Sequence, residues 1–229
     1  MNFSIIIPTL NEASAIQSCL SALQPLRHNC EIIIADGGST DNTADLADPL
    51  ADKIVTSEQG RGLQMNNGAR HARGEILIFL HVDTYLPENA LPGIQQQLAS
   101  NFQWGRFDIQ LSGSHFMLKL IAYMMNQRSR LTGIATGDQV IFVSRQAFAA
   151  AGAYPEIPLM EDIELCQALK KISPPVCLKA KVTSSARRWE QFGIYKTLLL
   201  MWSLRWRYFF GADPQLLADL YCRGHFWKP

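Results

Sequence analysis

The sequence predicts an α/β fold with a Rossmann-like, mostly parallel central sheet and helices on both faces. In the first 84 residues, short apolar runs alternate with stretches of helical spacing, which is typical of a parallel sheet. The run at 76–80 is continuous rather than alternating, as in a central strand covered on both faces. After residue 84 the pattern becomes irregular, and we expect a smaller antiparallel portion there.

The first half contains four predicted strands, at residues 3–7, 31–35, 52–56 and 76–80. A helix is predicted over 13–23, because its apolar residues recur three or four positions apart. A second helix is predicted over 60–72, after a Gly-Arg-Gly opening. The double glycine at 37–38 indicates a tight turn, and Ser39 or Asp41 can cap a helix that follows it.

The second half has predicted helices at 87–98, 116–126, 145–151 and 162–171, and predicted strands at 104–111, 140–143, 176–178 and 182–184. The strand at 104–111 alternates in places, as a sheet-edge or antiparallel strand would. The polar stretch 127–137 is predicted to be a loop. No segment is rich enough in Gly, Pro or Ser to separate two domains, so we expect one domain over 1–229.

The composition limits the class of protein. The chain has 229 residues, of which 48% are hydrophobic, and 21 basic against 20 acidic residues give a net charge of +1, so nothing favours nucleic-acid binding. The five cysteines are scattered, as in a protein with reduced thiols. No apolar run approaches the ~20 residues of a membrane span, and no signal-peptide pattern opens the chain. We therefore expect a cytoplasmic protein.

Polar residues stand where the strand 76–80 ends. His81 and Asp83 are two positions apart, so on an extended chain they point the same way. Ligands of open α/β sheets bind beyond the carboxyl ends of the strands. The pair can therefore hold a divalent metal and, through it, a phosphate. Alternatively, Asp83 caps the next turn and His81 is a satisfied edge histidine.

The ends of the other early strands carry further candidates. Asp36 can accept from a ribose hydroxyl or a base N–H, or it can bond the amides of its own turn. Thr9 and Glu12 can contact a base and a ribose, unless Asn11 merely caps the next helix. Arg61, at a helix N-terminus, can attract phosphate or lie exposed in a loop.

The second half adds a candidate general base and more positive charge. Asp162 can deprotonate a hydroxyl, although a carboxylate at a helix N-terminus is also favoured by the helix dipole alone. Arg187 and Arg188 can bind a pyrophosphate or form a solvated basic patch. Asp138 can line the pocket or make a turn.

The tail is apolar and aromatic over 192–210. Lys196, Ser203 and Arg207 share one helical face, and the face opposite carries Ile194, Leu198, Trp202 and Phe209, with Arg205 among them. Such a helix can pack on the domain, pair with a second subunit or rest on the inner face of a membrane.

In this order, the motifs resemble those of glycosyltransferase family 2. They are Pro-x-x-Asn-Glu at 8–12, Asp-Gly-Gly-Ser-Thr-Asp at 36–41, the carboxylate motif at 81–83 and Glu-Asp at 161–162, and they cover about the first 165 residues. The His-x-Asp form and the motifs at 137–139, 160–162 and 185–189 are similar to a bacterial subgroup associated with radical-SAM and selenium-domain genes, or with arsenosugar biosynthesis.

The resemblance implies a GT-A fold and inverting transfer of a sugar from a nucleotide-diphosphate sugar to an acceptor hydroxyl. It divides the chain into a nucleotide-binding half (1–84), an acceptor half (85–189) and a helical tail (190–229). It implies that Asp162 is the general base and that Asp83 binds the metal, Mn²⁺ or Mg²⁺. The nucleoside contacts it implies are Thr9, Glu12 and Asp36.

One position departs from the family. His81 replaces the first Asp of Asp-x-Asp, and a neutral imidazole suits Mn²⁺ better than Mg²⁺. This leaves open a nucleotide-sugar-binding protein with an altered metal site, while a nucleotidyltransferase is disfavoured because no basic loop follows the first strand. Sugar, base and acceptor have no marker in the sequence.

Overall fold

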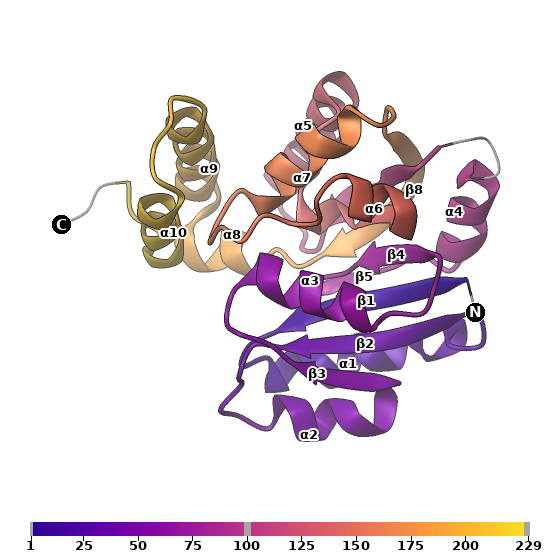
Figure 1. Ribbon diagram of the computed structural model, residues 1–229. Helices are drawn as coiled ribbons and strands as arrows, with labels where there is room; N and C mark the ends of the chain where they lie inside the picture. The colour runs from indigo at the N-terminus through magenta and orange to yellow at the C-terminus, as the bar shows by residue number, and fades with distance from the viewer. Residues whose placement is uncertain (1, 99–101, 227–229) are drawn as a thin grey trace.

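An eight-stranded mixed sheet, in the order β3-β2-β1-β4-β7-β6-β8-β5, forms the centre of the computed structural model, which describes residues 2–98 and 102–226 (Figure 1). The strands are β1 (Phe3–Thr9), β2 (Cys30–Asp36), β3 (Lys53–Thr56), β4 (Ile76–Phe79), β5 (Thr84–Tyr85), β6 (Trp104–Leu111), β7 (Ile141–Ser144) and β8 (Val176–Ser184). Strands β1 to β4 run parallel, and β7 joins them antiparallel to β4. The predicted fold class is confirmed.

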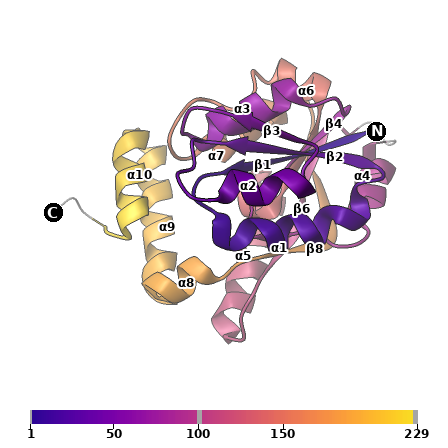
Figure 2. The same ribbon diagram turned by 90° about the horizontal axis from the view of Figure 1, so that it is seen from below.

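Helices cover both faces of the sheet (Figure 2). One face packs against α1 (Ala13–Leu23), α2 (Thr43–Ala47), α4 (Ala90–Leu98) and α5 (Phe116–Thr132). The other packs against α3 (Arg61–His71), α6 (Arg145–Ala150) and α7 (Glu161–Lys170). The parallel strands are apolar on both sides because both sides are covered: Ile5 and Ile7 face the first layer, and Ile6 faces the second.

The strand at 104–111 was predicted to be either an edge strand or an antiparallel strand, and it does not lie at an edge. β6 lies between β7 and β8, antiparallel to the first and parallel to the second. The two short strands predicted at 176–178 and 182–184 are a single strand, β8, whose pairing with β6 shifts register between Phe107 and Asp108. This irregularity interrupts the alternation that the sequence reading relied on.

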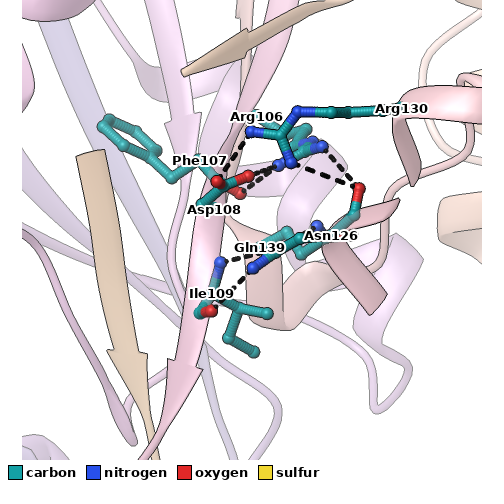
Figure 3. A network of polar contacts seen from close by, with 7 residues as sticks. All are labelled: Arg106, Phe107, Asp108, Ile109, Asn126, Arg130 and Gln139. Atoms are coloured by element: carbon teal, nitrogen blue, oxygen red, sulfur yellow. Dashed lines mark hydrogen bonds and ion pairs between the residues drawn. The ribbon is translucent and has the colours of Figure 1, made fainter. Parts of the chain in front are cut away.

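The predicted loop at 127–137 is wrong in its first part, because α5 continues to Thr132 and ends at Gly133, which has a φ of 68°. Polar contacts rather than apolar periodicity hold this last stretch (Figure 3). Arg130 donates to Asp108 at 2.7 Å, and Asp108 also pairs with the fully buried Arg106. Asn126 exchanges two hydrogen bonds with the backbone of Ile109, both 2.9 Å long.

Three further helices follow β8, namely α8 (Arg187–Phe192), α9 (Ile194–Phe209) and α10 (Pro214–Arg223). α10 lies within the tail 190–229 that was expected to be helical, although no separate helix was predicted there. It packs on α9 through Leu217 and Leu220 against Leu200 and Leu204. The buried face of α9 is therefore not the predicted apolar one, on which Trp202 and Phe209 are 52% and 79% exposed. Within the described part of the chain, no helix has the length and hydropathy needed to cross a bilayer.

Candidate active site

A cleft of about 1020 Å³ opens at the carboxyl ends of β1 and β4 and is walled by α5, α7 and the three C-terminal helices. Of the ten predicted site residues, all except Asp36 line it: Thr9, Glu12, Arg61, His81, Asp83, Asp138, Asp162, Arg187 and Arg188. Residues far apart in sequence therefore meet in one place, as the position of strand ends in an α/β sheet leads one to expect.

Asp36 lies just behind the cleft and holds the turn after β2. Its carboxylate accepts from the backbone N–H groups of Gly38 and Ser39 at 3.1 and 2.8 Å, as one of the two predicted alternatives required. It also accepts from the Thr9 hydroxyl at 3.1 Å. Because Thr9 lines the cleft, Asp36 orients a cleft residue without lining the cleft itself.

His81 is clamped between two neighbours. Its Nδ1 lies 3.5 Å from Oδ1 of Asp138. Its ring edge packs so closely on Gly137 that a Cβ there would come within 2.3 Å of Cε1 and Nε2. Burial opposes a charged imidazole, but the Asp138 carboxylate outweighs this and raises the pKa of His81. The pair thereby fixes the orientation of the imidazole ring.

Asp162 stands in the first turn of α7, after Met160, which has a φ of 73°. Its Oδ2 accepts from the backbone N–H of Gly137 at 2.7 Å, whereas Oδ1 is buried without a hydrogen-bond partner in the described structure. Burial and the adjacent Glu161 raise the pKa of Asp162 to about 7, with His81 and Arg61 opposing. One carboxylate oxygen is thus anchored, and the other is left without a hydrogen-bond partner among the described residues.

Arginines surround this carboxylate. Arg61 pairs with the buried Glu161 at 3.2 Å, and so does not lie free as an exposed loop residue. The guanidinium of Arg188 lies 3.6 Å from the ring centroid of Tyr221, and Arg188 also donates to the Tyr221 backbone oxygen. Arg187 approaches Glu12 at 3.8 Å, more weakly. Helix α10 therefore holds one arginine rigidly at the cleft.

Two side chains in the cleft, Asp83 and His81, are the candidate ligands of a metal ion. The Asp83 carboxylate lines the cleft and has no hydrogen bond or ion pair with any residue of 2–98 and 102–226, so its oxygens are free to bind a divalent cation. His81 fits less well, because Asp138 faces Nδ1 and Gly137 covers the Nε2 edge. Among the described residues, no three His, Cys, Asp or Glu side chains cluster as a metal site.

Several cleft residues were missed from the sequence. Gln64, on α3, donates to the backbone oxygens of Thr9 and Ala35 at 2.7 and 2.9 Å and ties the ends of β1 and β2 together. Arg128 and Arg205 line the far wall on α5 and α9. None of these residues lies at a strand end or in a motif. The positive charge of the two arginines was the one feature of the sequence that could have indicated a binding role.

The profile of Glycosyl transferase family 2 matches residues 4–147, from β1 into α6. The chain belongs to this family. The matched segment contains the cleft residues of β1 and α3, those that follow β4 and those of the short 3-10 helix at 137–139, whereas Asp162 and the C-terminal helices lie beyond it. As a member of glycosyl transferase family 2, the chain matches the family profile over its first 147 residues apart from the first three.

Two curated relatives are similar to this chain over part of their length. A PGL/p-HBAD biosynthesis glycosyltransferase of Mycobacterium bovis is 33% identical over 135 residues, which cover 47% of this chain and 52% of the relative. Glycosyltransferase AglE of Haloferax volcanii is 36% identical over 90 residues, covering 35% of this chain and 30% of its own. The chain thus matches about half the length of the first relative.

Solved structures share the fold at low identity. The mannosyltransferase PcManGT from Pyrobaculum calidifontis, in complex with GDP-Man and Mn²⁺, superimposes with a TM-score of 0.65 at 17% identity, covering 100% of this chain and 66% of that one. TarS of S. aureus, residues 1–349 with UDP-GlcNAc, gives 0.64 at 18% identity, covering 81% and 58%. These likenesses confirm the predicted GT-A architecture.

Proposed function

We propose that this protein is an inverting glycosyltransferase that moves a sugar from a nucleotide-diphosphate sugar to an acceptor hydroxyl, with Asp162 as the general base. The observation that carries the proposal is the state of the Asp162 carboxylate. Oδ2 is held by the Gly137 N–H, and Oδ1 is buried in the cleft without a partner among the described residues. A pKa of about 7 also suits a group that takes a proton near neutral pH.

The donor side follows from the strand ends. We assign the nucleoside to Thr9 and Glu12, with Asp36 orienting Thr9 through its hydrogen bond. Asp83 would hold a divalent metal, Mn²⁺ or Mg²⁺, which when bound supplies positive charge to a leaving diphosphate. The two fold neighbours that contain GDP-Man with Mn²⁺ and UDP-GlcNAc support a nucleotide-sugar donor here.

The transfer itself needs little beyond these groups. Asp162 takes the proton of the acceptor hydroxyl as its oxygen attacks the anomeric carbon from the face opposite the diphosphate, so a single displacement inverts that carbon. Arg187 and Arg188 line the cleft and stabilise the charge that develops on the leaving group. His81, fixed by Asp138, keeps the Gly137 loop in register with Asp162.

Two finer assignments belong to the same proposal. The motifs around His81, Asp138 and Arg188 support membership of the bacterial subgroup associated with radical-SAM and selenium-domain genes. We also infer that the protein acts in the cytoplasm, with its C-terminal helices available for contact with the inner face of a membrane.

The test is the substitution Asp162→Asn, which keeps the shape and an oxygen to accept from Gly137 but cannot take a proton. We expect transfer from a panel of nucleotide sugars, assayed with Mn²⁺ as release of nucleotide diphosphate, to fall by about 10²-fold or more. Donor-dependent thermal stabilisation should be retained. Glu156→Gln, at an exposed position outside the cleft lining, is the matched control.

Transfer by Asp162→Asn at a near-normal rate would show that the base is another group. Stabilisation by a donor without turnover on any acceptor, in the unsubstituted protein, would favour the nucleotide-sugar-binding alternative.

A further inference from the structure

One wall of the cleft, opposite in the sequence to the strand-end residues assigned to the donor, has no role in the transfer step proposed above. It is built by α5 and α9, and its side chains are largely apolar: Ile121, Met124, Met125, Leu198, Met201, Trp202 and Leu204. Figure 2 shows α5 and the segment α8–α9 at neighbouring positions on one side of the molecule, consistent with their shared lining of the cleft. An apolar wall of this extent favours an apolar ligand.

Two arginines interrupt that wall, and neither is neutralised. Nε and Nη2 of Arg128 are buried without a hydrogen-bond partner in the described structure. Burial alone, with no carboxylate near enough to offset it, lowers the pKa of Arg205 to about 10. Leaving guanidinium donors buried and unpaired is costly. A bound anion would satisfy the Arg128 donors, and Arg205 adds uncompensated positive charge to the same wall, so the wall favours an anion beside an apolar chain.

The apolar surface continues from the cleft to the outside along both helices. On α5, Phe116, Leu120 and Tyr123 are 67%, 45% and 60% exposed. On α9, the exposed side chains recur three or four residues apart on one face: Tyr195, Leu199, Trp202, Trp206 and Phe209. Trp202 belongs to both sets, since it lines the cleft and is 52% exposed. A chain leaving the cleft would therefore stay in contact with apolar side chains.

We propose that this wall is the acceptor subsite and that it takes an anionic amphiphile, with a phosphate-like group at Arg128 and Arg205 and an apolar chain leaving between α5 and α9. The inference rests on the proposed transferase function of the cleft. It names the chemical class of the acceptor, a phosphorylated lipid, which the donor-side motifs do not define.

The charge of the C-terminal segment favours an anionic occupant over a second copy of the chain. Residues 187–226 contain six Arg and Lys against three Asp and Glu, a difference of +3, whereas the whole chain carries +1. A two-fold contact through this face would bring two segments of like charge together, which is unfavourable. An anionic lipid instead complements the charge and covers the aromatic side chains.

Binding of defined probes tests the proposal without requiring turnover. Farnesyl phosphate, farnesol and glycerol 3-phosphate would be titrated calorimetrically into the full-length protein, below the micelle-forming concentration. We expect farnesyl phosphate to bind at least tenfold more tightly than either of the other two, because each lacks one of the two recognised groups. Arg128→Gln should weaken the binding of farnesyl phosphate at least tenfold.

Lys119→Gln is the matched control, since it removes one positive charge from an exposed position of the same helix outside the cleft lining. It should leave the farnesyl phosphate affinity unchanged. Arg205→Gln is the second variant and should weaken binding in the same direction as Arg128→Gln.

Equal affinity for farnesyl phosphate and farnesol would overturn the anion site, and equal affinity for farnesyl phosphate and glycerol 3-phosphate would overturn the apolar path. Wild-type affinity in both arginine variants would overturn the whole assignment. Donor-dependent stabilisation and nucleotide release, measured separately, report on the transferase function, so a failure of that function can be told apart from a failure of the acceptor assignment.

Discussion

Replacing Gly137 with alanine probes the centre of the proposed site with a single methyl group. The new Cβ would lie 2.3 Å from Cε1 and Nε2 of His81 and 3.2 Å from Oδ2 of Asp162. Gly137 is not among the glycines with positive φ, so the backbone accepts alanine and the effect is purely steric. The substitution therefore tests whether the His81 ring and the Asp162 carboxylate must remain in their present positions.

The magnitude follows from the distances. Ordinary van der Waals contact begins at 3.4 Å, so the His81 ring must move by about 1.1 Å, the difference between 3.4 and 2.3 Å. Overpacking of this kind costs about 1–3 kcal/mol of unfolding free energy. A misplacement of about 1 Å beside the reacting groups lowers a catalytic rate by about 10²-fold. We expect Gly137→Ala to show both effects.

The assays are urea denaturation for stability and nucleotide release in the presence of donor and Mn²⁺ for transfer. Gly93→Ala is the matched control, because a Cβ at this position of α4 meets only Leu178, at 4.0 Å. Adding His81→Ala to Gly137→Ala removes the obstructing ring and should recover most of the lost stability. A Gly137→Ala protein with wild-type stability and transfer within about threefold of normal would refute this account of the site.

Two further substitutions test the polar contacts that hold the cleft walls. Asp108→Asn leaves the fully buried Arg106 without its carboxylate. We expect the free energy of unfolding, measured by urea denaturation, to fall by about 3–5 kcal/mol. A fall of under about 1 kcal/mol would contradict a buried, essential ion pair. Tyr208→Phe removes the 2.6 Å hydrogen bond from α9 to Glu164 of α7, and amide exchange in α9 should accelerate by about tenfold, corresponding to roughly 1.4 kcal/mol; unchanged exchange would show that apolar packing alone holds the helix.

The early strands could be predicted because their burial is symmetrical. β1, β2 and β4 are covered on both faces, so they read as continuous apolar runs that few other structures produce. α1 spans Ala13–Leu23 as predicted, since Ile16, Leu20 and Leu23 all face the core. Where the burial of an element gives its apolar residues a single regular spacing, the element can be predicted from the sequence.

Elements held by polar contacts were misread. The last turns of α5 contain Arg128, Ser129 and Arg130, which resemble a polar loop until the ion pair from Arg130 to Asp108 is known. That pair joins residues 22 positions apart in the sequence, and apolar spacing carries no trace of it. The face of α9 failed for a related reason: apolar residues occur all around this helix, and α10 decides which of them are buried.

The site residues differ in the same way: those at strand ends could be predicted, and those in the interiors of helices could not. Thr9 ends β1, and His81 and Asp83 follow β4; the strand ends of a parallel sheet meet at one edge whatever the later packing. Asp36 also ends a strand, β2, but the turn after it supplies backbone N–H groups with which its carboxylate forms hydrogen bonds. Arg128 and Arg205 were not selected, because helix interiors offer no local signal that separates a cleft arginine from a solvated one.

The donor and acceptor sides of the cleft are therefore encoded differently, and the contacts of the C-terminal helices suggest why they can still act together. Tyr208 ties α9 to Glu164, two residues after the proposed base, and the same three-helix segment holds Arg188 against Tyr221. A ligand that displaced α9 would displace these contacts as well, so we expect binding at the proposed acceptor wall to be coupled to the positions of Asp162 and Arg188. Substitutions on the proposed acceptor wall should then change which acceptor is used, while the strand-end residues that we assign to the donor stay in place.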